Sequence, residues 1–229
     1  MNLMWKRVHF WAKWLFYESV IPLRIKLIIV VLALAGCLAL VTDQSTDFSL
    51  RQQNIFVITE VIFPMLAAIF TGNLILCERE QHTIEFLSIR ISLVKIWSIR
   101  MAVAIAWLHL LLLSELLILN WVYIDLNLGE SLLSAIGPTL GMVGIVSFTG
   151  VLSREANVGY VIGGVWWGLC LLSPGMASSF FGYFFFLFLR LFNPQADWIA
   201  NKVFLSSIGL FLIVISGWLI NASKERLIT

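Results

Sequence analysis

The sequence predicts an all-α integral membrane protein with six membrane-spanning helices. Hydrophobic residues make up 60% of the 229 positions, charged residues make up 12%, and the mean hydropathy is +0.95. Soluble domains are far more polar than this. A bilayer core of about 30 Å takes about 20 apolar residues per spanning helix. A chain of this length therefore holds six spans and no second globular domain.

Six segments are apolar enough to insert into a bilayer, namely residues 25–42, 55–77, 99–124, 131–152, 157–173 and 203–220. Residues 1–24 precede them and predict a helix that lies in the membrane interface. Met4, Val8, Trp11 and Leu15 share one helical stripe there, with Lys6, His9 and Lys13 opposite. The alternative is a leader helix packed on the protein itself. Residues 25–229 then form one transmembrane domain.

The distribution of Lys and Arg predicts that both termini are cytoplasmic. Cytoplasmic loops of membrane proteins carry an excess of these residues. With the N-terminus inside, three basic residues fall outside, Arg51, Arg190 and Lys202. Twelve fall inside: Lys6, Arg7, Lys13, Arg24, Lys26, Arg79, Arg90, Lys95, Arg100, Arg154, Lys224 and Arg226.

One further segment, residues 176–192, is apolar enough to be a seventh span. The charge rule does not decide the matter, because a seventh span again leaves twelve basic residues on one side and three on the other. Pro174-Gly175 precedes the segment and Asn193-Pro194 follows it. These breaks favour a re-entrant or interfacial element on the outer side, between the last two spans.

The longest polar stretch on the cytoplasmic side joins the second and third spans at residues 77–100. Residues 79–90 predict a short helix in which Ile84, Leu87 and Ile91 share one face, and Gln81, His82, Glu85 and Ser88 lie on another. A helix with such a mixed face, placed between two spans, can transmit force from a soluble partner into the membrane. The alternative is an amphipathic loop helix that rests on the bilayer.

This loop resembles that of the membrane subunits of type-2 ATP-binding-cassette exporters. Glu78-Arg79, Thr83-Ile84-Glu85-Phe86-Leu87 and the basic residues of 95–100 follow the family's pattern in order and spacing. The chain departs from it in having His82 where the family usually has Gly before the Thr, and in lacking a proline near Arg90. The resemblance extends to the architecture of nearly the whole chain.

The resemblance implies that residues 78–90 are a coupling helix that docks on an ATPase subunit. Its contacts would come from Glu78, Arg79, Gln81, His82, Thr83, Ile84, Glu85, Phe86 and Leu87. Two permease copies, or a copy and a paralogue, would pair over an ATPase dimer through their first and fifth spans. Close packing there would use the GxxxG pairs Gly159/Gly163 and Gly164/Gly168. The chain contains no phosphate-binding GxxxxGK[ST] loop, so ATP and Mg²⁺ are expected on the partner and no cofactor on this chain.

Three ionisable residues fall within predicted spans: Glu60 in the second, and His109 and Glu115 in the third. Charged groups are costly in hydrocarbon, so all three are candidates for a translocation pathway. For Glu60 the alternative is that its side chain reaches water, since it lies less than two turns from the outer end of its span. For His109 it is a packed, hydrogen-bonded histidine.

The sequence thus leads to a non-enzymatic permease in the plasma membrane that exports a peptide-like or amphipathic cargo. Lipid-linked glycans and drugs are equally compatible cargoes. An ion-coupled carrier or channel using Glu60 and Glu115 is the alternative, and an intramembrane protease is a more distant one. The net charge of +2 gives no reason to expect nucleic acid as a partner. The isolated Cys37, Cys77 and Cys170 predict neither a disulfide framework nor a metal site.

Overall fold

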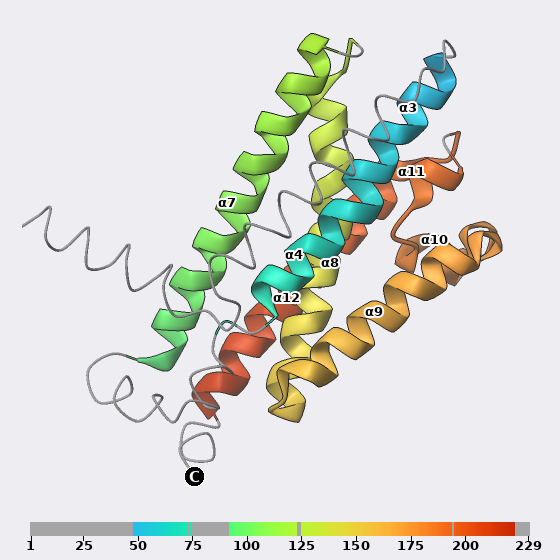
Figure 1. Cartoon of the computed structure of the whole chain (residues 1–229). Coiled ribbons are helices and arrows are strands. Elements are labelled where there is room, and N and C mark those ends of the chain that lie inside the picture. The colour runs from blue at the N-terminus through green and yellow to red at the C-terminus, as the bar shows by residue number, and fades with distance from the viewer. Residues whose placement is uncertain (1–47, 73, 75–91, 123–124, 194, 223–229) are drawn as a thin grey trace, which may run out of the picture.

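A computed structural model describes residues 48–72, 74, 92–122, 125–193 and 195–222, and within these residues the chain is entirely helical, with no strand (Figure 1). The elements in chain order are α3 (Phe48–Phe56), η1 (Val57–Ile62), α4 (Phe63–Thr71), α7 (Leu93–Val122), α8 (Leu128–Ser153), α9 (Ala156–Leu172), η2 (Pro174–Ser178), α10 (Phe180–Phe185), α11 (Leu189–Phe192) and α12 (Trp198–Ala222). The first three follow one another directly and form one rod.

Within the described residues, four helices are long and apolar enough to cross a membrane: Arg51–Thr71, Leu93–Trp121, Leu128–Ser153 and Trp198–Ala222. They correspond to four of the six predicted spans. The predicted span at 157–173 is the 17-residue helix α9, which is about 26 Å long at 1.5 Å per residue. The predicted span at 25–42, the interfacial helix at 1–24 and the coupling helix at 78–90 lie outside the described residues.

The long helices run antiparallel to their neighbours in sequence and define two ends of the bundle. We call the end where α3, α8 and α12 begin, and where α7 and α9 finish, the upper end, as drawn in Figure 1. The lower end holds the end of α4, the start of α7, the α8–α9 turn and the end of α12. Arg154 forms that turn with φ of 63°, and the Glu155 N–H bonds back to the Gly150 carbonyl.

Helix α8 lies at the centre of the bundle and contacts α4, α9 and α12. Its glycines allow the neighbouring backbones to come close. A methyl group on Gly137 would lie 2.8 Å from Lys202 Cα, and one on Gly144 would lie 2.6 Å from the Gly209 carbonyl oxygen. Helices in membranes associate through close packing of this kind, because lipid offers no hydrophobic driving force between them.

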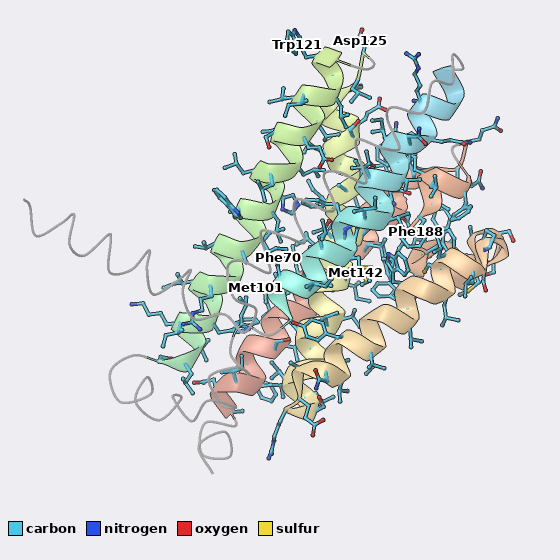
Figure 2. The ribbon with its side chains drawn as sticks, viewed as in Figure 1. Phe70, Met101, Trp121, Asp125, Met142 and Phe188 are labelled. Carbon is cyan, nitrogen blue, oxygen red and sulfur yellow. The ribbon has the colours of Figure 1, made fainter. Side chains whose placement is uncertain are left out.

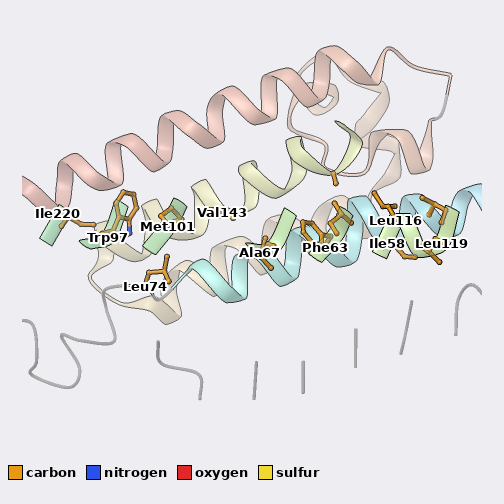
Figure 3. Close-up of a cluster of buried hydrophobic side chains, with 14 of the residues drawn as sticks. Ile58, Phe63, Ala67, Leu74, Trp97, Met101, Leu116, Leu119, Val143 and Ile220 are labelled. Atoms are coloured by element: carbon orange, nitrogen blue, oxygen red, sulfur yellow. The ribbon is translucent and has the colours of Figure 1, made fainter. Parts of the chain in front are cut away.

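A hydrophobic cluster fills the space between α4, α7 and α8 along the length of the bundle (Figure 3). Phe63 and Ala67 come from α4, Leu112 and Leu116 from α7, and Val143 from α8. All five are at most 5% exposed. The cluster fixes the rod that precedes α7 against the centre of the bundle.

The chain between α9 and α12 does not form a seventh spanning helix. Residues 174–193 instead make the 3₁₀ turn η2 and two short helices, α10 and α11, separated by residues 186–188. We call residues 174–193 the interrupted segment. It lies in the upper half of the bundle, on the side of α9 and α12 (Figure 1). The prediction that this segment is not a seventh spanning helix is thus confirmed, and its re-entrant or interfacial position stays a prediction.

Candidate functional site

A buried ion pair joins the rod to α12. Lys202 Nζ lies 2.6 Å from Glu60 Oε1, and the side chains are 2% and 0% exposed. The second carboxylate oxygen of Glu60 accepts a hydrogen bond from the Leu191 N–H at 3.1 Å. The alternative in which Glu60 reaches water is therefore wrong, because a cation on another helix compensates its charge inside the protein.

Pro64 explains why the rod changes from an α-helix to a π-helix around Glu60. Proline has no N–H, and in an α-helix its ring clashes with the carbonyl four residues earlier, here that of Glu60. The chain avoids this clash with the π-helical turn η1, in which the Phe63 N–H donates to the Ile58 carbonyl. Such turns recur at functional sites in proteins. The turn is tied to α8 through the Ser134 hydroxyl, 3.3 Å from Thr59 Oγ1.

Asn201 and Lys202 on α12 bind the backbone of the interrupted segment. The Asn201 amide donates to the carbonyl oxygens of Tyr183, Phe184 and Phe186 at 2.6, 3.2 and 3.1 Å. Lys202 Nζ donates to the Leu187 carbonyl at 2.9 Å. Non-helical backbone is tolerated at membrane depth only where protein groups satisfy it, and these two side chains supply donors.

Side chains of α9 contact the Phe185 carbonyl of the interrupted segment. Trp166 Nε1 donates to the Phe185 oxygen at 3.1 Å, and the Cys170 Sγ lies 3.8 Å from the same atom. At the surface of the segment, the Tyr183 hydroxyl donates to the Asp197 carbonyl. Burial, and then the nearby Asp197 carboxylate, raise the pKa of the Tyr183 phenol, so it remains a donor at neutral pH.

Arg190 forms a second ion pair between the interrupted segment and the start of α8. Its Nη2 lies 2.7 Å from Glu130 Oε2, and its Nη1 donates to the Glu130 carbonyl at 3.2 Å. The guanidinium also lies 4.4 Å from the ring centres of both Phe56 and Trp198. An arginine held between two aromatic faces gains cation–π energy as well as its salt bridge.

A cavity of about 50 Å³ lies beside this second pair, between the start of the rod and the start of α8. Gln52, Asp125, Asn127, Glu130 and Arg190 provide its polar edge. Glu130 is held in place at the first turn of α8, where the Asn127 side chain caps the helix by accepting from the Glu130 N–H at 3.3 Å. The second pair therefore lies at the surface, while the Glu60–Lys202 pair lies deeper.

The other two pathway candidates, His109 and Glu115, lie on α7. His109 Nδ1 is 2.8 Å from the Ile105 carbonyl, and its ring packs edge-on against Phe63 at 5.9 Å. This is the packed histidine that the sequence left as an alternative. Glu115 is half-buried and makes interactions within the protein.

The four glycines of α9 fall on two different faces. A methyl group on Gly159 would lie 2.4 Å from the Val146 carbonyl oxygen, and one on Gly163 would lie 2.4 Å from Val146 Cγ2, so both glycines contact α8 of the same chain. Gly164 and Gly168 have nothing within 4 Å of such a methyl group. Only this second pair is open to contact with another molecule.

Sequence reasoning missed Asn201, Lys202 and Arg190 as site residues. It assigned Lys202 and Arg190 to an outer loop, whereas α12 begins at Trp198, five residues before the predicted span, and buries Lys202. An adjacent Asn and Lys at the start of a long apolar run was the available signal, because polar groups inside spans usually have a partner.

Over the described residues, no group of three or more His, Cys, Asp or Glu side chains is placed to hold a metal ion. The site is instead two ion pairs and a set of backbone hydrogen bonds that fasten the interrupted segment to the bundle. No family model, curated protein or solved structure matches this chain.

Proposed function

We propose that this chain is the permease subunit of an ATP-binding-cassette exporter, in the plasma membrane and with both termini cytoplasmic. ATP and Mg²⁺ bind a separate ATPase dimer, and two permease copies or paralogues pair over it. The cargo is peptide-like or amphipathic. The observation that carries the proposal is the loop pattern from Glu78 to Arg100 between two spans.

The fold supports a cytoplasmic coupling loop at the lower end. Leu74 and Ser92 bracket the loop, and Arg100 on α7 donates from Nη1 to the Leu74 carbonyl at 3.0 Å. The last turns of α4 and the first turns of α7 are thus joined where the loop leaves and re-enters the bundle. A force applied to such a loop reaches both helices directly.

The bundle also supports an amphipathic cargo. A groove of about 610 Å³ lies between the lower half of α7 and the second half of α12. Trp97, Met101 and Trp218 are among its mostly apolar walls, and Ser92 and Asn221 provide polar groups toward the lower end. A surface with this division suits a molecule that has an apolar body and a polar end better than it suits a small polar solute.

Two features argue against the alternatives. An ion-coupled carrier that uses Glu60 and Glu115 needs both carboxylates available to its ion, whereas both oxygens of Glu60 are engaged, by Lys202 and by the Leu191 N–H. An intramembrane protease needs a convergent catalytic set. In the described part of the chain, His109 instead packs on Phe63 in the hydrophobic cluster.

The test is recovery of the ATPase partner from native membranes with the tagged full chain, followed by mass spectrometry for a phosphate-loop ATPase. The double substitution E85A/L87A is expected to reduce ATPase recovery at least tenfold, because it removes one polar and one apolar contact of the coupling helix. Membrane insertion should be unchanged.

The matched control is L152A/E155A, which removes the same residue types from the exposed end of α8 and the turn that follows it. It should recover the ATPase at the level of the parent chain. Equal recovery with the parent chain and E85A/L87A would refute the coupling assignment, and absence of any ATPase would refute the exporter.

A further inference from the structure

We propose that residues 186–189 form a movable plug in the upper half of the bundle, closed by two clasps. The inner clasp is the Glu60–Lys202 pair and the outer clasp is the Glu130–Arg190 pair. In the closed state all four plug side chains are at most 1% exposed. They pack among Val61 of η1, Met142 of α8, Cys170 of α9 and Leu205 of α12. Figure 2 labels Phe188 of the plug and Met142.

The plug is held mainly by side chains of the surrounding helices. Its carbonyls at 186 and 187 bind Asn201 and Lys202, and the Leu191 N–H just beyond it binds Glu60. Phe186 has an extended backbone with φ of −81° and ψ of 118°, which ends helix α10. A segment fastened in this way is released when a few side-chain contacts break, without unwinding a spanning helix.

The use of charges to hold the plug favours a switch over a fixed joint. A buried ion pair is often no more stabilising than an apolar pair of the same volume, and a switch or registry role is its best-attested use. An apolar pair would fill the same space but would leave the Leu187 carbonyl and the Leu191 N–H without their partners. A partly open state is unfavourable, because separating the two side chains inside the protein leaves both charges uncompensated.

The clasps differ in their access to water. The Glu130 side chain is 50% exposed and borders the small cavity, whereas Glu60 is fully buried. The outer clasp is therefore the one that solvent or cargo reaches first. Its opening removes the ion pair of Arg190, which adjoins Leu191 and hence the backbone bound to Glu60.

The role of the plug as an exit gate rests on the proposed function. Leu74 and Ser92, which bracket the proposed coupling loop, lie at the lower end and the plug lies in the upper half, so closure of the ATPase would have to break the clasps from a distance. The inner clasp joins the rod, which leads into the loop, to α12, and the outer clasp joins α8 to α11. The existence of the plug itself does not depend on an ATPase.

Cys170 provides a native reporter of the closed plug. It is 1% exposed, and its sulfur packs against the Phe185 carbonyl. With Cys37 and Cys77 replaced by Ala, the full chain in lipid nanodiscs exposes both ends to a charged maleimide. The E60M/K202M chain is expected to label at Cys170 at least tenfold faster than the parent, because the Leu187 carbonyl and the Leu191 N–H lose the side chains that hold them.

Two controls separate plug opening from general loosening. A135C, in a chain without native cysteines, reports a fully buried site on α8 away from the plug, and its labelling should be unaffected by E60M/K202M. E130Q removes the negative charge of the outer clasp alone and should label Cys170 about threefold faster, whereas E155Q, an exposed glutamate at the lower end, should not.

Unchanged Cys170 labelling in folded E60M/K202M would overturn the proposal. Should that chain fail to fold, unchanged labelling in E130Q would overturn it as well. Equal acceleration at Cys170 and at A135C would show general loosening and also count against the plug. If E60M/K202M labels fast at Cys170 but the parent chain recovers no ATPase, the plug stands and the exporter is rejected. If the ATPase is recovered but Cys170 labelling is unchanged, the exporter stands and the plug is rejected.

Discussion

Lys202 on α12 and Glu60 on η1 form an ion pair of 2.6 Å in the interior of the bundle, and the same lysine binds the Leu187 carbonyl. One side chain therefore connects the rod, α12 and the interrupted segment. Because both charges are shielded from water, each depends on the other for compensation.

Removing one member of this pair should cost more than removing both. K202M leaves the Glu60 carboxylate buried without its cation, and a loss of about 3–5 kcal/mol in the free energy of unfolding is expected. E60M should behave similarly, and E60M/K202M should lose less than either. The measurement is denaturant-induced unfolding in detergent, with K95M, an exposed lysine on α7, as the neutral control. Additive losses in the double variant would contradict a direct pair.

The α8–α12 contact predicts a strong difference between two glycine positions. A methyl group on Gly209 would lie 2.3 Å from the Leu140 carbonyl oxygen, whereas one on Gly164 meets nothing within 4 Å. G209A should lower the free energy of unfolding by about 1–3 kcal/mol, through overpacking. G164A should raise it by up to about 1 kcal/mol, because alanine favours helices. A G164A chain that folds normally but loses self-association would show that a second copy contacts this face of α9.

The place of Arg190 between Phe56 and Trp198 predicts that lysine is a poor replacement. R190K keeps the charge but loses the planar group that stacks on both rings. We expect a loss of about 1 kcal/mol in the free energy of unfolding, within the range of cation–π contacts. R154K, at an exposed turn of the lower end, is the matched control. An equal effect of both substitutions would show that the stacking contributes nothing.

The orientation can be tested with two exposed serines at opposite ends of the bundle. Ser178 lies in η2 at the upper end and Ser153 ends α8 at the lower end. In intact cells, S178C should react with an impermeant maleimide from outside and S153C should not, in a chain without native cysteines. Both should react after permeabilisation. The reverse pattern in intact cells would place the loop at 78–90 outside and reject an ATPase contact there.

Apolar runs predicted the existence of the long helices, and the Pro-Gly and Asn-Pro breaks predicted that residues 174–193 do not form one span. The ends of these helices were less well predicted. Lys202 was assigned to a loop because charged residues usually mark the end of a span, yet α12 carries it inside. Because the start of α12 was placed too late in the sequence, Lys202 was not recognised as the partner of Glu60.

The site itself was only half predictable. Glu60 stands out as a carboxylate in an apolar run, and Pro64 indicates a disturbed helix beside it. Their common product, a π turn that aims Glu60 at α12, depends on contacts between residues far apart in sequence. No local pattern contains those contacts, so Lys202 and Arg190 were not recognised as partners.

The glycine contact between α8 and α12 also limits how this bundle can move. Where Gly144 faces Gly209 and Gly137 faces Lys202, backbone meets backbone with no side chain between them. Two helices seated this closely shift as one body, since parting them would leave a gap that nothing on either helix can fill. Any rearrangement is then expected around this pair, in the rod, in α7 and in α9, with α8 and α12 as the fixed axis.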